Sequence, residues 1–205
     1  QAGVVRADSM EDLFDYARAF GYLKPLRGDR IAIVTNAGGP GILATDAIER
    51  AGLSMARFNP ERILTLKQGL PDAASAANPV DVLGDARADR FRFALEQVVE
   101  DAHVDAVVVI LTPQAMTDPT ETARKLVPYG HIEGKPVLAS WMGGTDVVEG
   151  AAILREAGIP TFDYPDEAVK VFNFTWRLAR NLQQIYETPT LPSDEEHPVD
   201  RAKAD

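Results

Sequence analysis

The sequence predicts an α/β fold in which a parallel sheet is covered by helices on both faces. Three observations predict it: short apolar runs alternate with amphipathic segments, the runs are rich in β-branched residues, and the strongest run, Ala106 to Leu111, contains no polar residue. Strands that are apolar on both sides need cover on both sides, which is typical of a parallel sheet between helices. The composition, 45% apolar and 25% charged, is that of a globular domain.

The chain begins with a predicted helix and linker. From Asp8 to Phe20 the apolar residues recur at helical spacing, and Asp8 or Ser9 can cap the first turn. A turn-rich link, Lys24 to Asp29, leads into the first strand. We therefore predict an N-terminal helix and linker from a preceding domain (1–28), one α/β domain (29–187) and an acidic, proline-containing tail (188–205). Because the chain starts without methionine, we also expect that it was excised from a longer protein.

Strands and helices alternate along the predicted domain. Gly52 and Gly158 each follow a helical segment and accept the left-handed backbone that ends a helix. The predicted strands cover residues 30–35, 53–58, 106–111, 135–140 and 160–162. The predicted helices cover residues 42–51, 60–69, 86–101, 117–127, 146–157 and 165–185, with an irregular stretch at 70–84. This series suits a flavodoxin-like, doubly wound sheet of five strands in the order 2-1-3-4-5, where ligands bind beyond the carboxyl ends of strands 1 and 3.

Composition argues against several classes of function. The formal net charge of −10, without a cluster of Lys and Arg, disfavours binding to nucleic acid. The chain has no cysteine and only three scattered histidines, so we expect neither disulfides nor a metal site. Its longest apolar run has six residues, far fewer than the roughly 20 that span a bilayer. Without a signal-peptide pattern at the N-terminus, we expect a cytoplasmic protein.

The loop after the first predicted strand is rich in glycine and precedes a helix. Glycines let the backbone approach a ligand closely, and a proline here fits the first helical turn. Free amides at a helix N-terminus carry partial positive charge, so the loop is predicted to bind a phosphoryl or carboxylate group. The alternative is a tight turn without a ligand, since the loop matches neither the dinucleotide fingerprint nor a P-loop. The loop consists of Asn36, Ala37, Gly38, Gly39, Pro40 and Gly41.

The loop after the third predicted strand should lie at the same edge. It offers hydroxyls and a side-chain amide next to a second helix start, and we predict that it lines the same site. The alternative is a plain capped turn, with Thr117 or Asp118 as the N-cap and Pro119 at the first helical position. The loop consists of Thr112, Pro113, Gln114, Ala115, Met116 and Thr117.

Two further segments carry polar residues. Asn78 and Asp81 lie in the irregular stretch before the third strand, and Asp81 is as well suited to holding loop amides as to contacting a ligand. The run from Trp141 to Asp146 is interpreted as a turn at the rim. No histidine has a convincing base or carboxylate partner, and Ser140 lacks the context of a nucleophile elbow. The sequence therefore shows no self-contained catalytic set.

Together, these segments resemble the nucleoside-diphosphate-forming acyl-CoA synthetases, the superfamily that includes succinyl-CoA synthetase. The resemblance covers about Gln1 to Pro189 and matches the flavodoxin-like domain at the carboxyl end of the succinyl-CoA synthetase β subunit. In combination the motifs are specific, whereas each alone is weak. The segments that carry it are Arg30 to Gly41, Asn78-Pro-Val-Asp81, Leu111 to Thr117, and the opening Gln1 to Arg6 followed by Glu11 to Asp15.

The resemblance implies a reversible reaction of acyl-CoA, NDP and phosphate to carboxylic acid, CoA and NTP through an acyl phosphate and a phosphohistidine. It implies that both loops line the acyl and phosphoryl site, with Asn78 and Asp81 nearby. The family's phosphohistidine motif, CoA-binding domain and ATP-grasp domain do not occur in this sequence. We therefore expect this domain to bind an acyl phosphate or carboxylate, to bind no cofactor alone and to be inactive alone. CoA, ATP or ADP and Mg²⁺ would belong to the full-length protein.

Two readings of the parent protein stay open. In the first, this domain completes a synthetase together with CoA-binding and ATP-grasp domains of the same protein or of a partner subunit, and a homo-oligomer is possible. In the second, it is a non-catalytic ligand-sensing or interaction domain of a larger acyltransferase-type protein. The motifs of this domain alone do not separate the two.

Overall fold

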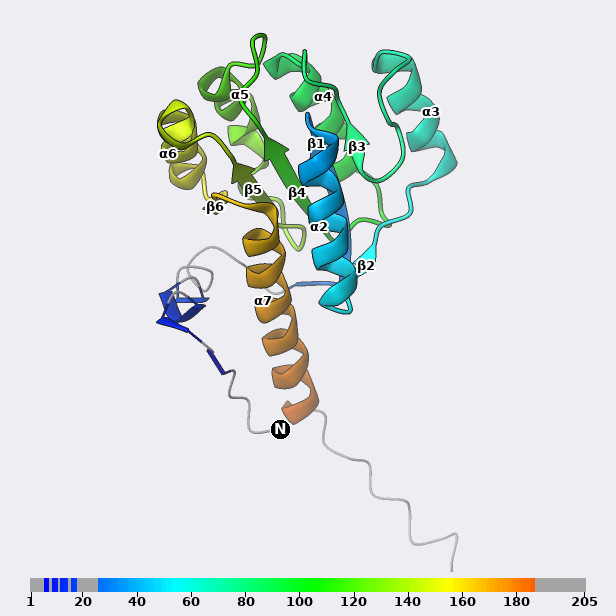
Figure 1. Ribbon diagram of the computed structural model, residues 1–205. Coiled ribbons are helices and arrows are strands. Elements are labelled where there is room, and N and C mark those ends of the chain that lie inside the picture. The colour runs from blue at the N-terminus through cyan, green and yellow to red at the C-terminus, as the bar shows by residue number, and fades with distance from the viewer. Residues whose placement is uncertain (1–5, 8, 11, 15, 18–25, 187–205) are drawn as a thin grey trace, which may run out of the picture.

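A parallel sheet of six strands forms the centre of the structure, with helices on both faces (Figure 1). The computed structural model describes residues 6, 7, 9, 10, 12–14, 16, 17 and 26–186. The hydrogen-bonded path through the sheet is β2-β1-β4-β5-β6, and β3 pairs with β1 off this path. The strands are β1 (Arg30–Thr35), β2 (Ser54–Met55), β3 (Val80–Asp81), β4 (Ala106–Leu111), β5 (Val137–Trp141) and β6 (Thr161–Phe162).

The predicted count of five strands is wrong, because β3 lies inside the stretch predicted to be irregular. β2 pairs with Arg30 and Ile31 at the start of β1, whereas β3 pairs with Val34 and Thr35 at its end. Two short strands thus share one edge of β1. A two-residue strand carries no periodicity, so the sequence pattern could not reveal it.

The helices lie close to their predicted positions, with one shift that matters for function. The predicted helix at 42–51 begins four residues earlier, at Gly38, inside the glycine-rich loop. In the predicted N-terminal helix, residues 10, 12–14, 16 and 17 are helical and Ser9 forms a bend, while its other residues and the predicted tail lie outside the described part. The helices are α2 (Gly38–Arg50), α3 (Pro60–Gly69), α4 (Ala88–Val99), α5 (Pro119–Leu126), α6 (Val148–Glu156) and α7 (Pro165–Tyr186), with 3-10 turns η1 (Val127–Tyr129) and η2 (Gly144–Val147).

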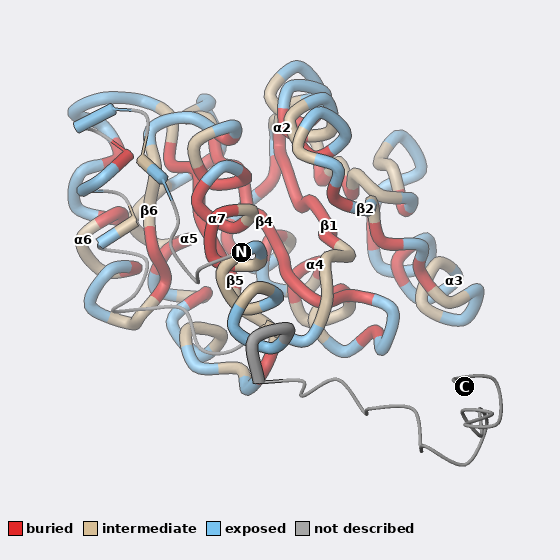
Figure 2. Tube along the Cα trace, turned by 90° about the horizontal axis from the view of Figure 1, so that it is seen from below, coloured by how far each residue is buried: buried red, intermediate tan, exposed pale blue. Residues whose placement is uncertain are grey.

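Each face of the sheet has its own apolar core. Along β4, Val108 and Ile110 pack with residues of α2 and α7, whereas Val107, Val109 and Leu111 pack with residues of α3 to α6. Figure 2 shows the buried strands in red between helices whose outer surfaces are pale blue. The alternation of buried side chains along one strand thus holds both helix layers on the sheet. None of the described helices is long and apolar enough to cross a membrane.

The described part of the N-terminal segment packs on α7. The ring of Tyr16 stacks on that of Phe174, with centroids 3.5 Å apart and planes 7° from parallel. Lys170 of α7 forms an ion pair with the buried carboxylate of Asp12. These contacts connect the segment before β1 with the last helix of the domain.

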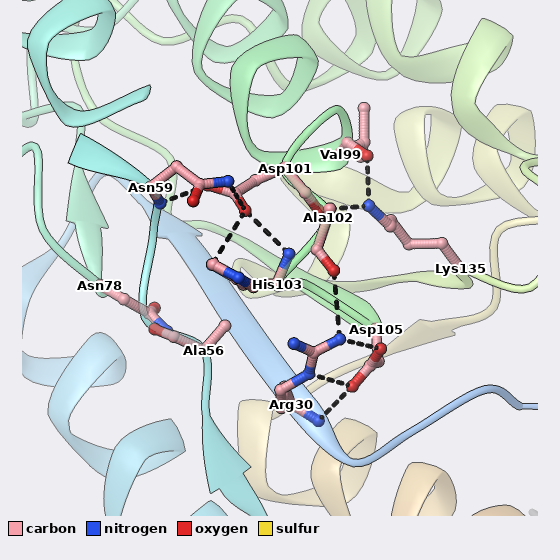
Figure 3. A network of polar contacts seen from close by, with 10 residues as sticks. All are labelled: Arg30, Ala56, Asn59, Asn78, Val99, Asp101, Ala102, His103, Asp105 and Lys135. Carbon is pink, nitrogen blue, oxygen red and sulfur yellow. Dashed lines mark hydrogen bonds and ion pairs between the residues drawn. The ribbon is translucent and has the colours of Figure 1, made fainter. Parts of the chain in front are cut away.

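Arg30 and Asp105 connect β1 with the residue that precedes β4, at the amino end of the sheet (Figure 3). One carboxylate oxygen of Asp105 accepts hydrogen bonds from the backbone N–H of Arg30 at 3.0 Å and from its Nε at 2.7 Å. The other accepts from Nη2 at 2.9 Å. Burial opposes ionisation of Asp105, but the hydrogen bonds and charge of Arg30 outweigh it and hold the pKa of this carboxyl below its ordinary value.

Beside this pair, Asp101 connects the loop before α3 with the loop that leads to β4. Its buried carboxylate accepts from the backbone N–H of Asn59 at 2.7 Å, from Asn59 Nδ2 at 3.1 Å and from the backbone N–H of His103 at 2.8 Å. Lys135 Nζ donates to the carbonyl oxygens of Val99, at the end of α4, and of Asp101. Burial lowers the pKa of Lys135, and the carboxylates of Asp101 and Asp105 partly restore it. The amino end of the sheet is therefore a polar network with its groups already paired.

We expect Asp105→Asn to destabilise the domain in a pH-dependent way. The pKa of Asp105 is lower in the folded than in the unfolded protein, so its ionised form stabilises the fold at pH values above the ordinary carboxyl pKa of about 3.9. This stabilisation is lost as the pH falls through the folded-state pKa. The side chain of Asp105 is 9% exposed and that of Arg30 is 40% exposed, so we expect a cost of about 1–2 kcal/mol near pH 7. Urea unfolding of both proteins from pH 7 to pH 3 should show their stabilities converging.

The matched control is Asp89→Asn. Asp89 also forms an ion pair, with Lys125 at 2.9 Å, but its side chain is 77% exposed. Exposed pairs of this kind contribute little to stability. An equal loss in both variants would contradict the special role of Asp105.

Candidate functional site

The two loops predicted to bind the ligand begin side by side, because β1 and β4 are paired neighbours. Their register joins Ile31 with Ala106 and Thr35 with Ile110. Parallel strands end at the same edge, so the residues that follow β1 and β4 meet there. The structure therefore brings Asn36 and Thr112 together.

Asn36 links these two loops through its side chain, which is 2% exposed. Its Oδ1 accepts hydrogen bonds from the backbone N–H of Thr112 at 2.9 Å and from Thr112 Oγ1 at 3.2 Å. Its Nδ2 donates to the carbonyl oxygen of Thr112 at 2.8 Å. Asn36 thus bonds to the backbone of the neighbouring loop in both directions, and its amide holds the site together from within.

Thr117 adds a third loop to this connection. Its hydroxyl, in a residue 7% exposed, accepts from Asn36 Nδ2 at 3.4 Å and donates to the carbonyl oxygen of Ala86 at 3.0 Å. The carbonyl oxygen of Gly84 lies 3.4 Å from the same hydroxyl. We call Asn36, Thr112, Thr117 and Ala86 the three-loop junction. The sequence did not single out Ala86 or Gly84, because they take part through backbone carbonyls.

The N-terminus of α2 is open at the same edge. Ala37, its N-cap, has an extended backbone (φ −144°, ψ 119°) and makes no side-chain cap. Its own N–H donates to Thr35 Oγ1 at 3.0 Å, while the next two N–H groups, of Gly38 and Gly39, find no acceptor among the described residues. Both glycines are exposed. Two free amides at the positive end of a 13-residue helix form a place for an anion.

The glycines of this turn have different local roles. A Cβ on Gly41 would lie 3.1 Å from Cγ2 of Thr35, so the buried Gly41 allows α2 to pack closely on β1. A Cβ on Gly39 would meet nothing within 4 Å. The fold therefore does not require glycine at position 39, and the space beside it is open to a ligand.

Asp81 borders this space. Its Oδ1 accepts from the backbone N–H of Leu83 at 2.9 Å, and Leu83 has the left-handed φ of 70°. Its Oδ2 lies 3.6 Å from where a Cβ of Gly38 would be. Asp81 thus holds the turn after β3, the structural one of its two predicted roles. An anion on the two amides would also lie near its negative charge.

The side chain of Asn78, which was predicted with the site residues, bonds to the edge of β1 away from the free amides. Its Oδ1 accepts from the backbone N–H of Ile33 at 2.9 Å, and its Nδ2 donates to the carbonyl oxygens of Ile31 and Ala56 at 2.9 and 3.0 Å. These bonds fill the gap between β2 and β3 on the edge of β1. Its amide therefore replaces ladder hydrogen bonds and does not border the free amides of α2.

The outer residues of the second loop line the rim. Gln114 Nε2 lies 3.4 Å from the carbonyl oxygen of Asn36, and its side chain crosses Gly84, where a Cβ would clash. Pro113 packs on Gly143 of the turn after β5. Ala115 and Met116 are exposed and border a hollow of about 510 Å³ between the first turns of α4 and α5.

The two described histidines lie away from this edge. His103 belongs to the network at the opposite end of the sheet, and His131 packs over Gly158. Within the described ranges, no group of three or more His, Cys, Asp or Glu side chains could hold a metal ion. What this edge offers is a pair of amide donors at a helix N-terminus, which is suited to an anion.

Comparison with known proteins shows similarity to CoA ligases in both a family profile and individual relatives. A family profile described as the Ligase-CoA domain matches residues 31–186. The acetate–CoA ligase (ADP-forming) I of Archaeoglobus fulgidus is 40% identical over 205 residues, which is 100% of this chain and 28% of that protein. The 4-hydroxybutyrate–CoA ligase (ADP-forming) of Nitrosopumilus maritimus is 36% identical over 83% of this chain and 24% of that protein.

Solved structures show the same relation. The dinucleotide forming acetyl-coenzyme A synthetase 1 of Ca. Korarchaeum cryptofilum, in complex with phosphate and ADP, superposes with a TM-score of 0.82 at 28% identity. The match covers 93% of this chain and 41% of that chain. The chain thus spans about a quarter to two fifths of the length of these relatives.

We expect Asn78→Ala to destabilise the domain by about 2–3 kcal/mol, because the backbone N–H of Ile33 and the carbonyl oxygen of Ala56 lose this partner, while the carbonyl oxygen of Ile31 keeps the N–H of Ala56 at 2.8 Å. The side chain of Asn173, a similarly half-buried residue of α7, makes no hydrogen bond to the described residues, so Asn173→Ala is the matched control. Thermal and urea unfolding of both variants checks this prediction. A stability of Asn78→Ala equal to that of the control would show that the amide does not hold the sheet edge.

Proposed function

The chain belongs to the Ligase-CoA domain family, and from this premise we propose that it is the part of an NDP-forming acyl-CoA synthetase that holds the phosphoryl or acyl group. The observation that carries the proposal is the pair of free amides, Gly38 and Gly39, at the N-terminus of α2. They lie at the carboxyl edge of a parallel sheet, where doubly wound folds bind ligands. We take the strand path to be a flavodoxin-like arrangement extended by β3.

The proposed overall reaction is acyl-CoA, NDP and phosphate to carboxylic acid, CoA and NTP. In its first half, phosphate attacks the thioester carbonyl, the acyl phosphate forms and CoA leaves as the thiol. In its second half, the phosphoryl group passes through a histidine to NDP and the carboxylate is released. Each half moves a negatively charged group, and fixed amide donors stabilise such charge without reacting.

The chemistry that the described residues do not supply is assigned to other parts of the protein. No described histidine borders Gly38, and we propose that the phosphohistidine comes from another domain or a partner subunit. Asp81 offers one carboxylate near the anion, and Mg²⁺ is commonly held by one or two carboxylates together with nucleotide phosphates. We therefore place Mg²⁺ with the bound nucleotide. CoA and ATP or ADP likewise belong to the other domains.

A partner domain should cover the surface beside the amides. Ile42 and Leu43 follow the glycine-rich turn on α2, and their side chains are 64% and 54% exposed. The relatives contain more than twice the length of this chain, which leaves room for the domain that brings the histidine. We propose that this domain docks over Ile42, Leu43 and the open amides. The cytoplasmic location and a homo-oligomer stay predictions.

An activity assay distinguishes the synthetase from the alternative, in which the full-length protein senses a ligand without turnover. The full-length protein is incubated with ATP, CoA and a panel of short carboxylic acids, and acid-labile phosphorylation and thioester formation are measured. Phosphohistidine together with thioester supports the synthetase. A folded full-length protein that shows neither would favour the sensing domain.

We expect Gly39→Val to lower the turnover of the full-length protein by about 100-fold or more, because its side chain would fill the space where the anion meets the amides. The backbone at Gly39 needs no glycine and a Cβ there meets no neighbour, so the thermal midpoint should change little. Turnover with saturating acyl-CoA and ADP and varied phosphate provides the measurement.

Glu49→Val, on the exposed last turn of the same helix, is the control. It places the same β-branched side chain on α2 away from the amides and should keep full turnover. Normal turnover by a folded Gly39→Val protein would show that the two amides are not part of the phosphoryl or acyl site.

We expect Ile42→Glu to lower turnover by about 10-fold or more while leaving the unfolding curve of this chain unchanged, because a charge would be buried where the partner domain docks. Leu64→Glu on α3, at a side chain that is 58% exposed, is the matched control and should turn over normally. Equal activity of both variants would argue that α2 is not covered by a partner.

A further inference from the structure

We propose that Thr117 is a positioning residue for the phosphoryl site, and that its hydroxyl sets the spatial relation of three helix N-termini. The inference deepens the proposed function and rests on it. Thr117 reaches no ligand itself, because it is buried beneath the loops that surround the site. It acts through the backbone groups that the three-loop junction holds in place.

Each of the three residues that this hydroxyl joins stands two residues before the first residue of a helix. Asn36 stands two residues before Gly38, the first residue of α2. Ala86 stands two residues before Ala88, the first residue of α4. Thr117 itself stands two residues before Pro119, the first residue of α5. One hydroxyl therefore connects the start of α5 with the starts of α2 and α4.

The hydrogen-bonding capacity of the hydroxyl suits this role. A threonine hydroxyl has one hydrogen to donate and two lone pairs to accept with. It donates to the carbonyl oxygen of Ala86 at 3.0 Å and accepts from Asn36 Nδ2, which is also bound to the carbonyl oxygen of Thr112. With only 7% of Thr117 exposed, water cannot readily replace the hydroxyl. Its loss would leave the carbonyl of Ala86 without this donor and the link to Asn36 broken.

The effect on catalysis follows from the position of Asn36. Only Ala37 separates it from the two free amides, so a shift of Asn36 moves Gly38 and Gly39 relative to α5. Stabilisation by preorganised donors depends steeply on where those donors point, and displacement of about 1 Å can cost 100-fold in rate. The residue should therefore affect the rate of phosphoryl or acyl transfer more than the binding of acyl-CoA.

The test compares four forms of the full-length protein: wild type, Thr117→Val, Thr117→Ser and Thr175→Val. Valine keeps the shape of threonine and removes the hydroxyl, whereas serine keeps the hydroxyl. Thr175 is the matched control, because it is 8% exposed and its hydroxyl donates only within α7, to the carbonyl oxygen of Val171 at 3.0 Å. Rates are measured with acyl-CoA, ADP and inorganic phosphate, giving kcat and the KM of each substrate.

We expect Thr117→Val to lower kcat by about 10- to 100-fold with little change in the KM for acyl-CoA. Thr117→Ser should recover most of the turnover, and Thr175→Val should match wild type. Full turnover by Thr117→Val would overturn the inference. So would equal losses in Thr117→Val and Thr175→Val, or a failure of serine to restore the rate, since these point to general destabilisation.

Amide hydrogen exchange separates this inference from the proposed function. If the hydroxyl positions the loops, Thr117→Val should speed exchange by about 10-fold or more at residues 36–41 and 84–88, with α7 unchanged. Wild-type protein without synthetase turnover would refute the proposed function alone, and the exchange pattern would still test the positioning. Unchanged exchange in both loops would refute the positioning even if wild type is an active synthetase.

Discussion

The pairing of β1 with β4 is the constraint on which the rest of the site depends. Because Thr35 and Ile110 lie in register, the next residues of both strands emerge together at the carboxyl edge. The side chain of Asn36 can then bind the backbone of Thr112 in both directions, and α2 and α5 begin on opposite faces of the sheet around that link. A slip of one residue would exchange the faces of the strand and separate these groups.

The two ends of the sheet differ in how their polar groups are satisfied. At the amino end, Arg30, Asp101, Asp105 and Lys135 form a network of internal hydrogen bonds and ion pairs, which stabilises the fold (Figure 3). At the carboxyl edge, the amides of Gly38 and Gly39 have no partner among the described residues. Both glycines are exposed, so their amides are accessible to a ligand, and the proposed anion site rests on this contrast between the two ends.

Several residues predicted to contact a ligand have a structural task in the fold. Asn36 connects two loops, Asn78 replaces ladder bonds on the edge of β1, and Thr117 joins three helix starts. Asp81 holds the turn after β3 and also borders the site. In the proposed site, a small contact surface, the backbone at the start of α2, is thus combined with a larger set of side chains that shape it. Substitutions at either set should affect activity for different reasons.

The amino-acid sequence by itself determined the α/β class and the location of most helices and strands, and it predicted the edge at which we propose that a ligand binds. Apolar periodicity, turn residues and the glycine-proline start of α2 act locally, so they can be recognised from neighbouring residues. Only the tertiary structure decided that α2 begins at Gly38, that β3 joins the sheet, and which partners Asn36, Asn78 and Thr117 have. Those partners stand 76, 47 and 31 residues away along the chain. A side chain that bonds a backbone group so distant is positioned by the packing of the strands and helices between them, and no local pattern records that choice.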